Sequence, residues 1–94
     1  MLKFFVEFLG TFVFLSVILL KGKAIPIGIA LAAVIFMGGD VSGGNFNPAV
    51  SFSMLMSDKL NVMNFVGYVA VQLLAAACAV YFVKSSHSLV GAEA

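Results

Sequence analysis

The sequence has few of the residues on which enzymes and nucleic-acid-binding proteins depend. Its 94 residues include no arginine, one histidine (His87) and one cysteine (Cys78). Without arginine, and with a net charge of +1, the chain has neither bidentate phosphate ligands nor a basic surface for nucleic acid. One histidine and one cysteine cannot assemble a base, a nucleophile and an orienting group, or a cluster of metal ligands. We therefore expect no catalytic residues, no metal, no cofactor and no internal disulfide.

Charged residues are also too few to cover a soluble domain. Only 10% of the residues are charged, whereas 63% are hydrophobic. A folded chain of this composition would have almost no polar surface to expose to water. The composition therefore predicts a multi-pass integral membrane protein in a lipid bilayer, with one domain over residues 1–94; it does not indicate which membrane.

Three apolar segments are interpreted as spans of a hydrocarbon core of about 30 Å. They cover residues 2–20, 24–38 and 62–83, and a polar tail follows from Lys84 to Ala94. The first has 19 residues and no small-x-small cleavage site after it, so we interpret it as a retained span and not as a signal peptide.

A fourth apolar segment, Pro48 to Met56, has only nine residues. As a helix it reaches roughly 13 Å, about half of the membrane. A glycine-rich stretch precedes it, Asn47 is the expected N-cap and Pro48 takes the first helical position. We predict an all-α fold with three transmembrane helices and one re-entrant loop and half helix over about 39–56.

The lysines do not specify an orientation. Three spans place the termini on opposite faces, with Lys3 and Lys59 on the face of the N-terminus and Lys21, Lys23 and Lys84 on the other. Two against three gives no clear bias under the positive-inside rule. The chain is therefore expected to be able to insert both ways up.

Three motifs in order give the chain a resemblance to the aquaporin and aquaglyceroporin (major intrinsic protein) family. They are Glu7-Phe8-Leu9-Gly10-Thr11-Phe12, then Ser42-Gly43-Gly44-Asn45-Phe46-Asn47-Pro48-Ala49-Val50, and finally the pair Tyr68 and Gln72. They resemble the motifs of the N-terminal half of such a channel. Members of this family usually fuse two inverted halves, the second with arginine after its Asn-Pro-Ala motif. Here Val50 follows Ala49, and Asn45 stands where the family often has histidine.

The resemblance implies roles for particular residues. Asn47, Pro48 and Ala49 would form the pore motif, and the backbone carbonyls of three residues would line the pore, namely Gly43, Gly44 and Asn45. Glu7 and Gln72 would support the re-entrant loop. The family's offsets from the motif asparagine assign the selectivity constriction to Ile27, Ile35, Gly44 and Val50. Such a constriction would be apolar, which predicts weak discrimination against neutral solutes larger than water.

A half helix that ends at mid-membrane needs protein or a water-filled cavity around its exposed backbone. A second, inverted copy would supply that cover, as in many transport proteins. We therefore expect a passive channel for water, or for small neutral solutes such as glycerol, formed by an antiparallel homodimer. The resemblance further implies four such pores, an assembly of eight chains.

Three alternatives stay open at this point. The chain pairs with a different half that carries the missing arginine, or it is a non-conducting structural or regulatory membrane protein. The third alternative is that the sequence is part of a longer chain.

Overall fold

The computed structural model describes residues 1–89, which form four helices. They are α1 (Leu2–Lys21), α2 (Ala24–Ser42), α3 (Pro48–Met56) and α4 (Val62–Leu89). Within the described residues, α1, α2 and α4 are long and apolar enough to cross a membrane. The protein is therefore an all-helical integral membrane protein with three candidate spans and one short helix.

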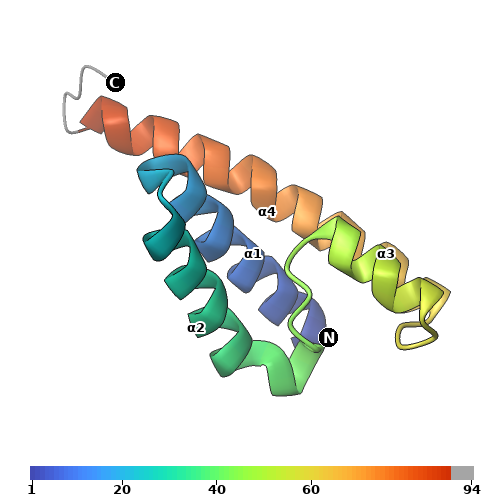
Figure 1. Cartoon of the computed structure of the whole chain (residues 1–94). Helices are drawn as coiled ribbons and strands as arrows, with labels where there is room; N and C mark the ends of the chain where they lie inside the picture. The colour runs from blue at the N-terminus through green and yellow to red at the C-terminus, as the bar shows by residue number, and fades with distance from the viewer. Residues whose placement is uncertain (90–94) are drawn as a thin grey trace.

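Helix α1 is central to the packing. It lies between α2 and α4 and contacts both of them, while α3 packs against α4 (Figure 1). The α1–α4 contact includes an edge-to-face pair of the Phe4 and Tyr68 rings, with centroids 5.7 Å apart. The loop after α2 runs back from the end of the molecule that holds the N-terminus to the start of α3 (Figure 1).

Local chain chemistry explains most helix ends. Helix α1 stops at Gly22, whose φ of 63° lies in the left-handed region where glycine has no steric cost. Helix α3 begins as the sequence predicts: Pro48 occupies the first turn, and the Asn47 side chain accepts a hydrogen bond from the Val50 amide. Asn61 accepts in the same way from the Asn64 amide at the start of α4, at 2.7 Å.

The predicted end of the second span at residue 38 is wrong, because α2 continues to Ser42. Gly38 is a close-packing position and does not end the helix: a methyl group added there would lie 2.5 Å from Val6 Cγ1 on α1. The helix ends instead at Gly43, which has a φ of 91° and donates its amide hydrogen to the Gly39 carbonyl at 2.8 Å. The loop before α3 is thus five residues long, 43–47.

Helix α4 extends beyond the predicted third span into the predicted polar tail. Helix α4 continues through Lys84 and His87 to Leu89, and His87 is half-buried. Its 28 residues make it about 42 Å long, longer than a hydrocarbon core of about 30 Å. Lysine and serine are tolerated in a helix that has left the apolar layer, so polarity alone does not end it. Residues 90–94 of the predicted tail lie outside the described part of the chain.

The interior of the described chain is polar, whereas its outer surface is apolar. Six hydrophobic residues are buried, three of them alanines, together with seven polar residues: Glu7, Thr11, Ser16, Ser42, Asn45, Ser51 and Gln72. Large side chains such as Phe36 and Met37 point outward. This distribution suits a lipid environment, in which apolar side chains can face outward without cost.

Candidate functional site

The loop 43–47 has an unusual backbone shape. Gly43, Gly44 and Phe46 all have positive φ angles, of 91°, 67° and 61°. Glycine adopts this region readily, but a bulky residue such as phenylalanine rarely does so. Asn47 then returns to an extended conformation, with φ −163° and ψ 153°, and α3 begins. The loop therefore needs support from elsewhere in the fold to hold this shape.

Glu7 on α1 lies under this loop and is fully buried. Its carboxylate accepts four hydrogen bonds. Oε1 accepts from the Phe46 amide at 2.7 Å and from Gln72 Nε2 at 2.9 Å. Oε2 accepts from Ser42 Oγ at 2.7 Å and from the Asn45 amide at 3.0 Å. Two donors to each oxygen use the full accepting capacity of a carboxylate, so Glu7 sits where a cluster of donors converges.

Ser51 on α3 joins this cluster to the short helix. Its Oγ accepts from Gln72 Nε2 at 2.8 Å and from Asn45 Nδ2 at 3.0 Å. Gln72 therefore bridges Glu7 on α1 to Ser51 on α3 from its position on α4. The network connects α1, α3, α4 and the loop through side chains that are almost completely buried.

Tyr68 and Ser42 secure the other end of the loop. The buried Tyr68 hydroxyl donates to the Ser42 carbonyl at 2.7 Å, and Ser42 Oγ accepts from the Gly44 amide at 3.1 Å. Sequence reasoning did not assign a role to Ser51 or Phe46. The only available signal was a serine four residues after Asn47, on the first turn of an apolar helix.

The residues predicted to form the pore motif lie at the edge of the network. Asn47 is half-buried, and its Oδ1 accepts from the Val50 amide at 2.9 Å. Within residues 1–89 the side-chain nitrogen of Asn47, Nδ2, makes no hydrogen bond. In the same part of the chain the backbone carbonyls of Gly43, Gly44 and Asn45 accept none. Pro48 is half-buried and Ala49 is exposed. One donor, on Asn47, and three acceptor carbonyls, on residues 43–45, therefore lie in neighbouring positions of the loop without a hydrogen-bond partner among the described residues.

The four residues predicted to form the constriction do not all come together in one chain. Ile35 packs on Gly44, since a methyl group added there would lie 3.5 Å from Ile35 Cγ1. Val50 is half-buried in the first turn of α3. Ile27, in contrast, lies in the first turn of α2, about 22 Å along the helix axis from Ser42. One chain places Ile27 at the opposite end of α2 from the loop.

Among the described residues, no group of three histidine, cysteine, aspartate or glutamate side chains could hold a metal ion. Cys78 is a free, half-buried cysteine in α4.

Comparisons with known proteins give a consistent result. The family model for "Major intrinsic protein" matches residues 17–93. The chain is 39% identical over 103 residues to a glycerol uptake facilitator protein-like 6 of Lactiplantibacillus plantarum, with 100% of this chain and 48% of that protein aligned. It is 34% identical over 96 residues to aquaporin PIP1-6 of Zea mays, with 84% of this chain and 32% of that protein aligned.

The lens fiber major intrinsic protein of Gallus gallus is 38% identical over 55 residues, which cover 58% of this chain and 21% of that protein. No solved structure matches the chain. The chain spans about half the length of the facilitator-like relative and a smaller share of the others. The family match over residues 17–93 shows that the chain belongs to the major intrinsic protein family, whose members are membrane channels and not enzymes.

Proposed function

We propose that this chain forms a passive channel for water and small neutral solutes such as glycerol, with each pore built between two copies in opposite orientations. The observation that carries the proposal is the division of hydrogen-bonding groups in the loop. The amides of Asn45 and Phe46 point to Glu7, and the Gly44 amide points to Ser42. The carbonyls of Gly43, Gly44 and Asn45 have no partner within residues 1–89, so they can accept from a permeant.

Asn47 supplies the complementary donor. Its Oδ1 is occupied by the Val50 amide, which leaves Nδ2 to donate to the oxygen of water or of an alcohol. Asn47 also caps α3, so the positive end of that helix dipole lies at the same place. Two inverted copies would bring two such ends together, and this field would repel cations and orient water against proton transfer.

The inverted pairing is supported by what one chain leaves uncovered. Non-helical backbone at membrane depth is tolerated only where protein or a water-filled cavity surrounds it. In this chain Gly43 is exposed and Gly44 is half-buried. Pairing would also place Ile27 of one copy near the Ile35, Gly44 and Val50 of the other, completing an apolar constriction at each mouth. Four dimers side by side, eight chains in all, would match the assembly that the family resemblance implies.

Stopped-flow light scattering on proteoliposomes that contain only this chain tests the channel. We expect water flux under a sucrose gradient to exceed that of empty liposomes, with a low activation energy, and glycerol flux to accompany it. Flux equal to that of empty liposomes from folded protein would contradict the proposal, and would favour a different partner half or a non-conducting role.

The inverted pairing has a separate test. Ser57 is exposed in the turn after α3, and Cys78 is the native cysteine. In a Cys78→Ala background, Ser57→Cys should react with a membrane-impermeant maleimide from both sides of the membrane in comparable amounts. Labelling from one side alone would exclude two orientations of the same chain.

A further inference from the structure

Phe46 stands between the buried network and the pore motif. It is completely buried, it precedes Asn47 directly, and its φ is 61°. A bulky residue in the left-handed region is a strained conformation that persists only where its surroundings determine it. Two contacts do so here: one is the hydrogen bond from the Phe46 amide to Glu7 Oε1 at 2.7 Å.

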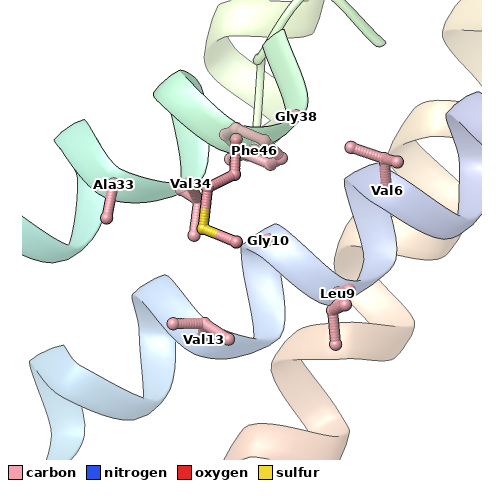
Figure 2. A pocket seen from close by; sticks show the side chains of 9 residues that line it. Val6, Leu9, Gly10, Val13, Ala33, Val34, Gly38 and Phe46 are labelled. Carbon is pink, nitrogen blue, oxygen red and sulfur yellow. The ribbon is translucent and has the colours of Figure 1, made fainter. Parts of the chain in front are cut away.

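The second contact is made by the ring. It lies between α1 and α2, close to Gly38, and lines an apolar cavity of about 320 Å³ between these helices (Figure 2). The ring also packs directly against Gly10. A methyl group added to Gly10 would meet Phe46 Cε1, and would lie 2.6 Å from Cδ1 and 2.8 Å from Cζ. At Gly38 an added methyl group would lie 3.7 Å from Cζ. The ring therefore fits a slot that exists because residue 10 has no side chain, whereas a methyl group at residue 38 would be in ordinary van der Waals contact with it.

Because Phe46 is held at both its amide and its ring, its backbone cannot rotate. The backbone of the next residue, Asn47, is therefore fixed in direction as well. We propose that the seat of the Phe46 ring on Gly10 sets the direction and depth of the Asn47 amide group, so that Phe46 is a positioning residue for permeation. This inference deepens the proposed function and rests on it for its effect on flux. It predicts that a larger side chain at position 10 must be compensated by a smaller one at position 46. The proposed role of Asn47 alone does not predict this compensation.

The test uses two readouts in lipid nanodiscs or liposomes. One is water permeability per folded protein. The other is the NMR signal of the Asn47 side-chain amide in asparagine-labelled protein, which needs no conduction. Gly10→Ala should shift that signal and lower water permeability about tenfold, the effect of about 1.4 kcal/mol. Adding Phe46→Leu, which removes Cε1 and Cζ, should return both readouts toward the wild-type values.

The chain offers two matched glycine controls. A methyl group added at Gly67 on α4 would lie 2.5 Å from Phe4 Cε1. This is a comparable clash with a ring that does not contact Gly10 or Phe46 and reaches the loop only indirectly, through Tyr68 and its hydrogen bond to the Ser42 carbonyl. At Gly28 on α2 an added methyl group would have nothing within 4 Å. Both Gly67→Ala and Gly28→Ala should leave the Asn47 signal in place. An equal shift in Gly67→Ala would overturn the proposal, because general helix packing would then explain the effect.

If Gly10→Ala does not fold, Phe46→Leu alone tests the same point without an added clash. It should shift the Asn47 signal, whereas Phe4→Leu should not; no shift in Phe46→Leu would overturn the proposal. The two proposals fail separately. An Asn47 signal that follows the 10/46 pair in a protein without flux would support the positioning role and contradict the channel. Normal flux with an Asn47 signal unaffected by Gly10→Ala would overturn the positioning role alone.

Discussion

Gln72 on α4 donates a hydrogen bond to Glu7 on α1 at 2.9 Å, across 65 residues of sequence. The same Gln72 nitrogen donates to Ser51 on α3 at 2.8 Å. A single amide group therefore links the two adjacent spans to the short helix. In an apolar environment such links matter because water cannot replace a lost partner.

Glu7→Gln should destabilise the protein by about 3 kcal/mol, because the new amide nitrogen would face donors that the carboxylate accepts, and buried donors without a partner are costly. Unfolding equilibria in mixed micelles, followed by circular dichroism, measure this. Asp58→Asn is the matched control, since Asp58 is exposed and its φ of 62° is one that asparagine tolerates. Equal stability of both variants and the wild type would contradict the supporting role of Glu7.

Tyr68→Phe should cost about 1 kcal/mol, because it removes the 2.7 Å hydrogen bond to the buried Ser42 carbonyl and changes little else. Tyr81→Phe provides the comparison. Tyr81 is 76% exposed, so removing its hydroxyl should change the free energy of unfolding by no more than about 0.5 kcal/mol. The same micelle unfolding assay applies; a Tyr68 variant as stable as the Tyr81 variant would show that this hydrogen bond does not hold the loop.

Asn47→Asp separates folding from permeation. Aspartate keeps the oxygen that caps α3, so stability should change little, but the donor Nδ2 becomes an oxygen and a negative charge is placed in the pore. We expect a sharp fall in water and glycerol flux in stopped flow.

Asn61→Asp makes the same chemical change at the other asparagine cap, which accepts from Asn64 at the start of α4. It should leave flux unchanged. Wild-type flux in Asn47→Asp would remove Asn47 from the proposed pore.

Ile27→Phe tests the constriction. A larger side chain there should lower glycerol flux relative to water flux about tenfold, as a misfit of one or two carbon groups does in a tight apolar passage. Ile29→Phe, at a residue that is 64% exposed on the same helix, should not alter the ratio. Parallel glycerol and sucrose gradients give the ratio directly, and the same ratio in both variants would exclude Ile27 from the constriction.

Local signals in the sequence were sufficient for the short helix and for the membrane spans. Asparagine followed by proline before an apolar run predicts the capped N-terminus of a helix. Asn47 and Pro48 both act within the first turn of α3, so no distant residue is needed. The ends of the second and fourth helices were less predictable. Glycine is compatible both with the end of a helix and with close packing between two helices. Gly38 takes the second role because Val6, 32 residues earlier on α1, packs against it.

The sequence by itself determined that the chain is a membrane protein with three spans and a short capped helix, because hydrophobic length and helix caps act over a few neighbouring residues. Only the tertiary structure decided which groups surround the loop. Ser51 joins Asn45 and Gln72, and the Phe46 ring fills a slot at Gly10 and Gly38. These contacts depend on the packing of α1 against α2 and α4, and a buried polar group takes its partner from whatever that packing brings within hydrogen-bonding distance.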